Sequence, residues 1–191
     1  PELNDMVTVR DLVSHRIGFG LGAGDLLFWP TTTYSNREVA ERLRDVPLTG
    51  GFRERYAYDN ILYGVAQLVI EQASGQSYEQ FLRTRIFQPL GMRDTVAHQD
   101  GVDDVARRAY GYSALDGRWQ RTDQSPTSAV LGDGGIYSSL DDLARWDAAL
   151  YDQRLLTTAS LRQAFAPATR TNEPDVPFYG FGWRLNGDAQ W

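Results

Sequence analysis

The longest apolar stretch of the sequence runs from Ile61 to Ala73 and constrains the fold more than any other segment. Ser74 and Gly75 follow it directly. Glycine is the residue that most readily adopts the left-handed conformation with which many helices end. We therefore predict one long apolar helix over residues 61–73.

Further helices are expected wherever a serine or threonine stands before an apolar pattern and can cap the first turn. In most of these places an acidic or amide residue follows three positions later, as in a capping box. The capping or first residues are Thr8, Ser35, Ser77, Ser139 and Thr158. The helices are expected to extend to about Val13, Arg44, Phe87, Tyr151 and Phe165, and Pro89 with Gly91 should stop the third of them.

Strand signals are fewer. Residues 109–112 and 118–120 flank Asp116-Gly117, a pair typical of a two-residue type I′ hairpin turn. From residue 179 to residue 185, apolar side chains alternate with glycine or arginine, which is the period of a strand. Asn186-Gly187 then predicts a second turn, with residues 188–191 as the start of a returning strand. Together these patterns predict a mainly α chain with a few short antiparallel strands.

The basic residues set a limit on the chemistry. All 19 of them are arginine, whose guanidinium stays protonated and cannot accept a proton at working pH. A mechanism in which lysine activates a nucleophile therefore cannot be completed within these 191 residues. The net charge of −6 makes nucleic acid and anionic membranes poor partners, and no apolar run is long enough to span a bilayer. Because the sequence has no cysteine, disulfides and thiolate metal sites are excluded.

Two sequence patterns resemble a cofactor site or a catalytic site, but the structure expected around each of them argues against that function. Residues 18–23 fit G-x-G-x-x-G/A, but a dinucleotide site needs a strand before this motif and a helix after it. Here a helix is expected before it, so we interpret the segment as a loop. Ser14 and His15 are neighbours on the first expected helix, where adjacent side chains diverge by about 100° and cannot form a catalytic pair. We therefore interpret His15 as a residue that caps the helix or satisfies a buried contact.

Tyr58-Asp59-Asn60 is more informative, because it lies where an irregular segment passes into the long apolar helix. In an extended approach, residues two apart point the same way, so Tyr58 and Asn60 can present a phenol and an amide to one cleft. A phenol, with a pKa of about 10, becomes a useful base only when cations stabilise its phenolate. The spacing alone also permits a structural role, with Asn60 as a helix N-cap and Tyr58 as a packed aromatic.

Six segments resemble, in the same order, motifs of the serine hydrolases related to class C β-lactamases, penicillin-binding proteins and esterases. They cover nearly the whole chain. The segments are Val9–Gly18, Phe52–Asn60, Ser74–Tyr78, Ile86–Met92, Gly134–Trp146 and Tyr179–Trp183. Tyr58-x-Asn60 corresponds to the second active-site motif of that family.

The resemblance implies a helical domain packed on a mostly antiparallel sheet. Residues 1–177 would form the helical domain, with an inserted hairpin near residues 109–120, and residues 178–191 would begin the strands of the sheet domain. The family's Ser-x-x-Lys motif is expected upstream of this stretch, and its third motif, Lys-Thr-Gly or His-x-Gly, downstream. We therefore expect the sequence to be the central part of a longer enzyme and to be inactive alone.

Four residues carry roles over from the resemblance. Tyr58 would be the general base, Asn60 would contact the substrate or a lysine, and Gly134 and Gly135 would line the cleft. Asp59 stands where the family more often has serine or alanine. Its negative charge would oppose a lowered pKa of Tyr58 unless its side chain points away.

The function implied by the resemblance is hydrolysis of an ester, amide or β-lactam bond of a small molecule through a serine acyl-enzyme, with no metal or organic cofactor. The alternative is a non-catalytic scaffold or peptide-binding module that keeps the fold. The resemblance also favours a bacterial, periplasmic or secreted protein. The expected strand near the end of the sequence predicts self-association through residues 178–191 if no other strand covers its apolar face. That face consists of Tyr179, Phe181, Trp183 and Leu185.

Overall fold

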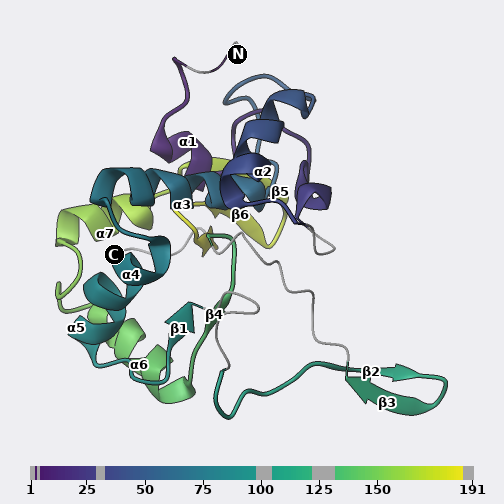
Figure 1. Ribbon diagram of the computed structural model, residues 1–191. Helices are drawn as coiled ribbons and strands as arrows, with labels where there is room; N and C mark the ends of the chain where they lie inside the picture. The colour runs from purple at the N-terminus through teal and green to yellow at the C-terminus, as the bar shows by residue number, and fades with distance from the viewer. Residues whose placement is uncertain (1–2, 4, 29–32, 98–104, 122–131, 187–191) are drawn as a thin grey trace.

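The computed structural model describes residues 3, 5–28, 33–97, 105–121 and 132–186. Helices and short antiparallel strands make up this part of the chain, which confirms the predicted fold class (Figure 1). The α-helices are Val9–Val13 (α1), Asn36–Arg42 (α2), Ile61–Ser74 (α3), Tyr78–Leu82 (α4), Gln88–Leu90 (α5), Leu140–Ala149 (α6) and Thr158–Ala164 (α7). The strands are Val96–Ala97 (β1), Tyr112–Leu115 (β2), Arg118–Arg121 (β3), Ile136–Tyr137 (β4), Thr169–Glu173 (β5), Val176–Tyr179 (β6) and Arg184–Leu185 (β7).

The long helix expected from the apolar stretch is α3, and it packs against α1, α2 and α4. Gly75 ends it with a φ of 69°, as the sequence predicted. Ile61 and Leu62, at its start, are almost completely buried in a core that also includes Leu12 and Val39. A second core lies at the other end of the molecule, between α4, α5 and α6. None of the helices in the described residues is both long and apolar enough to cross a membrane.

The capping residues correctly predicted where the other helices begin, and the differences concern mainly where the helices end. Ser35, Ser77 and Ser139 each accept the expected hydrogen bond from the backbone of the first turn. The last helix begins at Thr158, as predicted, and Thr157 caps it. The prediction that Pro89 ends its helix was wrong. A π-helical stretch, Arg83–Phe87, follows α4 and leads directly into α5, which contains Pro89. The helix ends at Gly91, which adopts a φ of 68°, as expected.

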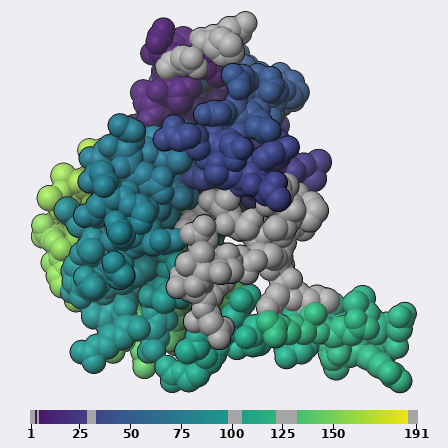
Figure 2. Space-filling view, viewed as in Figure 1, coloured from purple at the N-terminus to yellow at the C-terminus, as the bar shows by residue number. Residues whose placement is uncertain are grey.

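The predicted hairpin is β2–β3, with Asp116 and Gly117 at its turn, both at positive φ (51° and 72°) as a type I′ turn requires. Its first strand covers residues 112–115, however, rather than the predicted residues 109–112. It extends away from the rest of the protein (Figures 1 and 2). The continuous strand predicted over residues 179–185 is interrupted instead. β6 ends at Tyr179, Gly182 adopts a φ of 77°, and β7 begins only at Arg184.

The strands near the end of the described chain pair within the chain itself. β6 lies between β5 and β7 in a three-stranded antiparallel sheet, so the sheet begins before residue 178. Tyr179 and Leu185 are buried, and the Trp183 ring stacks on Trp146 with 5.6 Å between centroids. Self-association through residues 178–191 stays a prediction, and the turn expected at Asn186-Gly187 with its returning strand lies mostly outside the described residues.

A buried carboxylate ties the segment before Tyr58 to α1. Asp11 is completely buried and accepts hydrogen bonds from Arg53 at 2.9 and 2.7 Å and from Arg16 at 2.7 Å. Its own helix is capped through Thr8, whose hydroxyl donates to Asp11. The backbone N–H of residue 57 then donates to the carbonyl of His15. These contacts hold the approach to Tyr58 against the end of α1.

Asp142 plays a comparable part in the second core. It is completely buried in α6 and accepts hydrogen bonds from the Asp94 N–H, the Thr95 hydroxyl and Arg145. β1, which follows Thr95, pairs with β4, which leads into α6. The pairing of β1 with β4 fixes one end of the loop of residues 132–135, and the hydrogen bond from the Gly132 N–H to Gln67 Oε1 holds its other end against α3.

Candidate active site

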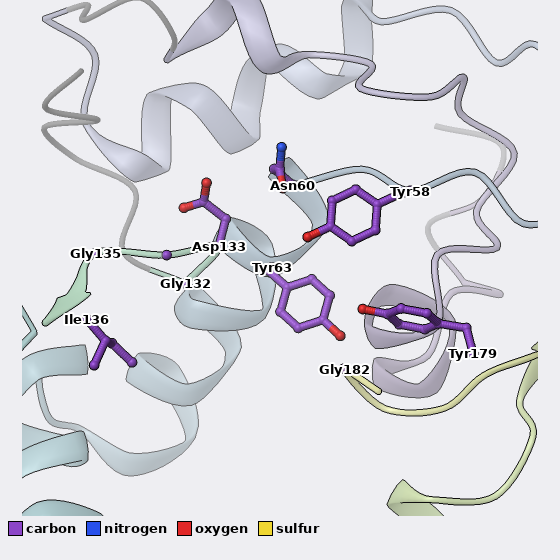
Figure 3. A pocket seen from close by; sticks show the side chains of 10 residues that line it. Tyr58, Asn60, Tyr63, Gly132, Asp133, Gly135, Ile136, Tyr179 and Gly182 are labelled. Carbon is purple, nitrogen blue, oxygen red and sulfur yellow. The ribbon is translucent and has the colours of Figure 1, made fainter. Parts of the chain in front are cut away.

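A cavity of about 340 Å³ lies where α3, the loop before β4 and the end of β6 meet (Figure 3). Three phenol rings form much of its wall, and four consecutive residues of the loop form another part. It is lined by Tyr58, Asn60, Tyr63, Gly132, Asp133, Gly134, Gly135, Ile136, Tyr179 and Gly182. The phenol of Tyr58 reaches in from one side and Asp133 lies on the other, with Asn60 between them (Figure 3).

Tyr58 is held by its backbone and by its ring. Its carbonyl accepts a hydrogen bond from Gly22, in the glycine-rich loop, at 2.9 Å. Its ring lies 4.4 Å from the ring of His15. Burial raises the pKa of the Tyr58 phenol, and the negative charge of Asp133 raises it further. The phenol is therefore protonated at neutral pH in the absence of additional cations.

Asp59 does point away from the cavity, since it is completely buried and is not part of the lining. Both of its carboxyl oxygens lack a hydrogen-bond partner among the described residues. Burial raises its pKa to about 7. The charge that opposes a Tyr58 phenolate is therefore that of Asp133 and, to a smaller extent, Asp25, rather than that of the neighbouring residue.

Asn60 occupies the N-cap position of α3 but makes no capping hydrogen bond with its side chain. Its amide Nδ2 instead donates to Oδ2 of Asp25 at 3.2 Å. With the N–H side of the amide directed at Asp25, the carbonyl Oδ1 is the atom left to accept a hydrogen bond from a ligand. The purely structural role that the sequence permitted for Asn60 as a capping residue is therefore not the one observed.

His15 supports the site from behind. It is 1% exposed, and its Nδ1 accepts a hydrogen bond from the backbone N–H of Asp59 at 3.1 Å. Burial lowers its pKa to about 4, so the imidazole is neutral. The rings of Tyr56, Tyr58, Tyr63 and Tyr179 surround it, with centroids between 4.4 and 5.8 Å away. His15 thus fixes the backbone between Tyr58 and Asn60, which agrees with the buried contact expected for it.

The loop of residues 132–135 reaches the cavity because Gly132 packs directly on α3. Its N–H donates to Oε1 of Gln67 at 2.9 Å, and a Cβ at this position would lie 2.1 Å from the carbonyl oxygen of Tyr63. Any other residue would push the loop away from the helix. Asp133 follows at once, and burial raises its pKa to about 6. Its carboxyl is consequently ionised at neutral pH but protonated in mild acid.

The four residues singled out from the sequence, Tyr58, Asn60, Gly134 and Gly135, lie together on this one cavity. Their catalytic and binding roles stay predictions. Ser14, rejected as a nucleophile, is buried and donates its hydroxyl to the Arg10 carbonyl at 2.6 Å.

Four lining side chains were not predicted from the sequence: Tyr63, Asp133, Ile136 and Tyr179. Tyr63 could have been found, because it lies one helical turn after Asn60 on the same face. Asp133 could also have been found, because it directly precedes Gly134 and Gly135, which were predicted to line the cleft.

Comparisons of the sequence with a family model and with known proteins point to the same family. The family model described as Beta-lactamase matches residues 3–191. Penicillin-binding protein 4* of Bacillus subtilis (strain 168) is 30% identical over 203 residues, covering 96% of this chain and 44% of that protein. The D-alanyl-D-alanine-carboxypeptidase/endopeptidase AmpH of Escherichia coli (strain K12) is 31% identical over 146 residues, covering 73% of this chain and 35% of that protein.

Among solved structures, the D-amino acid amidase of Ochrobactrum anthropi SV3 in complex with D-phenylalanine superposes with a TM-score of 0.77 at 25% identity. The match covers 92% of this chain and 54% of the amidase. The chain therefore spans less than half the length of the two curated relatives and about half of the amidase.

Proposed function

Since the chain belongs to the beta-lactamase family, we propose that its full-length protein is a serine hydrolase that cleaves an ester, amide or β-lactam bond through an acyl-enzyme. One observation carries the proposal. Tyr58 and Asn60, spaced as in the family's second motif, open onto one cavity together with Gly134 and Gly135. A packing tyrosine and a capping asparagine would not need to share a cavity.

Amide bonds are the favoured substrates within this range. The relatives and the structural neighbour include a carboxypeptidase/endopeptidase and an amidase. Because the chain spans only part of these proteins, the substrate of the whole protein is part of the proposal.

The proposed reaction has two stages. A serine oxygen attacks the carbonyl carbon of the substrate while its proton passes to a neighbouring base, and backbone N–H groups stabilise the negatively charged carbonyl oxygen. The tetrahedral intermediate then expels the leaving group, which takes up a proton from the Tyr58 hydroxyl. In the second stage water attacks the acyl carbon and gives a proton to the Tyr58 phenolate. The bond to the serine oxygen then breaks, and the protonated base returns its proton to that oxygen. In this proposal the serine and a lysine come from residues other than these 191, which contain no lysine.

Because the pKa of Tyr58 is raised, the residues outside this chain must supply positive charge if Tyr58 is to act as a base. A phenol in this cavity is a proton donor, which suits protonation of the leaving group. It can accept the serine proton only when cations beside it offset burial and the charge of Asp133. We propose that the lysine next to the serine supplies such a cation.

Covalent labelling tests the proposal. Full-length protein, incubated separately with a fluorescent penicillin, a nitrophenyl ester and a fluorophosphonate, is expected to gain one adduct per chain with at least one of the three by intact mass spectrometry. The 191-residue chain alone should gain none. The absence of any adduct on a folded full-length protein would favour the non-catalytic scaffold. Stoichiometric labelling of the short chain would show that the nucleophile lies within it.

A further inference from the structure

We propose that Asp133 is a specificity-determining residue, which binds a positively charged amino group that the substrate carries close to the bond to be cleaved. This inference rests on the proposed function, whose substrate class it narrows to amino compounds of about amino-acid size.

The position of Asp133 provides the first argument. Its side chain lines the cavity, on the side opposite the Tyr58 phenol (Figure 3). Its Oδ1 is buried and has no hydrogen-bond partner among the described residues. A buried carboxylate oxygen without a donor is costly, and this cost is removed when a ligand supplies an N–H group. Among the described residues, this oxygen therefore has no hydrogen-bond donor.

The remaining lining supplies acceptors rather than cations. Asn60 directs its Nδ2 at Asp25, which leaves its Oδ1 as the amide atom that can accept a hydrogen bond. Of the described residues that line the cavity, none is an arginine or a histidine. Arg184, a cation near Tyr58, has its guanidinium 2.8 Å from Glu173. An ammonium group, with three donors and no acceptor, matches this set of atoms better than a neutral or anionic group does.

Electrostatics and size favour the same ligand. Asp25, which holds Asn60, adds a second negative charge that raises the pKa of Asp133 in addition to the effect of burial. On this side of the cavity, these two carboxylates therefore contribute negative charge at neutral pH, which attracts cations and repels carboxylates. A volume of about 340 Å³ is near the lower end of the roughly 300–1,000 Å³ of small-molecule sites. Such a space is large enough for an amino acid derivative.

A rival explanation is that Asp133 pairs with the lysine of the proposed catalytic machinery. That role would affect every substrate to the same extent, whereas a contact with the substrate's own amino group affects only substrates that carry one. Acetylation of the amino group distinguishes the two, because it removes the charge and leaves the bond to be cleaved unchanged.

The experiment compares phenylalanine p-nitroanilide with its N-acetyl derivative, in D and L forms, on the full-length protein. We expect the wild-type kcat/KM for the free amine to exceed that for the acetylated compound by about tenfold or more in at least one enantiomer. Asp133→Asn should lower this ratio by about tenfold. Asp116→Asn removes the same charge from the turn of the distant β2–β3 hairpin, and should leave the ratio at its wild-type value.

A binding measurement separates this inference from the proposed function. Isothermal titration with phenethylamine and N-acetylphenethylamine needs no turnover, and should show the same preference in the wild type and its loss in Asp133→Asn. If no anilide is cleaved and none of the three covalent probes labels the protein, but this binding preference is found, the assignment of Asp133 stands and the hydrolase proposal fails. If cleavage occurs with a wild-type ratio near one, or if Asp133→Asn slows both substrates equally, the assignment is wrong and the hydrolase proposal stands. If Asp133→Asn does not fold, the wild-type ratio alone tests the assignment, because a ratio near one would show that the amino group is not recognised.

Discussion

Replacing Tyr58 with phenylalanine in the full-length protein is expected to slow acylation about 10²- to 10⁴-fold, the usual contribution of a group that transfers a proton in the transition state. The change removes one hydroxyl and keeps the ring, whose contact with His15 is part of the buried aromatic cluster. The fold should therefore remain intact, with a melting temperature close to that of the wild type. Rapid-mixing measurements of acylation by a chromogenic ester or β-lactam would give the rate.

Tyr56→Phe is the matched control for this experiment. Tyr56 belongs to the same ring cluster around His15, but it is absent from the cavity lining, and its hydroxyl has no hydrogen-bond partner among the described residues. Removing a hydroxyl that is buried and unpaired should be close to neutral. If Tyr58→Phe acylates at the wild-type rate and only melts lower, Tyr58 is a packing residue and the role proposed for it is wrong.

The largest effect on stability is expected from Asp11→Ala, which should lower the free energy of unfolding by about 2–4 kcal/mol. The substitution leaves Arg16 and Arg53 without the carboxylate that they share, and it removes the acceptor of the Thr8 cap. Because Arg53 remains partly exposed, the loss should fall short of that for a fully buried pair. Urea unfolding of the full-length variant would measure it. Asp152→Ala, which breaks an exposed ion pair with Arg154, should change stability by less than about 1 kcal/mol.

The same network has a definite pH dependence. The arginine contacts hold the pKa of Asp11 well below its usual value of 3.8. The folded state therefore favours the ionised carboxyl, and this contribution is fully present above the usual pKa. It is lost as the pH falls below that value toward the folded pKa. Wild type and Asp11→Ala should consequently converge in stability in strong acid.

The sequence predicted the helices well because their ends depend on local chemistry. A serine that caps a first turn, or a glycine with positive φ after the last one, acts within a few residues of itself, as at Ser35 and Gly75. The hairpin at Asp116-Gly117 was predictable for the same reason. One strand prediction was wrong because a turn interrupts an alternating pattern. Residues 179–185 have the period of a strand, but Gly182 turns the backbone between β6 and β7.

The candidate site was predictable only in part. Tyr58 and Asn60 could be named because they lie two residues apart in one motif. Asp133 lies more than 70 residues away, and it reaches the cavity through the packing of Gly132 on α3 and the pairing of β1 with β4. Likewise, the hydrogen bond between His15 and Asp59 depends on how α1 packs beside the segment that carries Tyr58. Spacing along the sequence carries no signal of these contacts, because they depend on tertiary packing.

The central claim, that this cavity is where an acyl-enzyme forms, is tested most directly by a crystal structure of the full-length protein acylated by a penicillin or a phosphonate. The account predicts that the adduct occupies the cavity between Asn60 and Gly135, with the Tyr58 hydroxyl within about 3.2 Å of the reacting serine oxygen. An adduct bound elsewhere, with the Tyr58 hydroxyl remote from the serine oxygen, would contradict it.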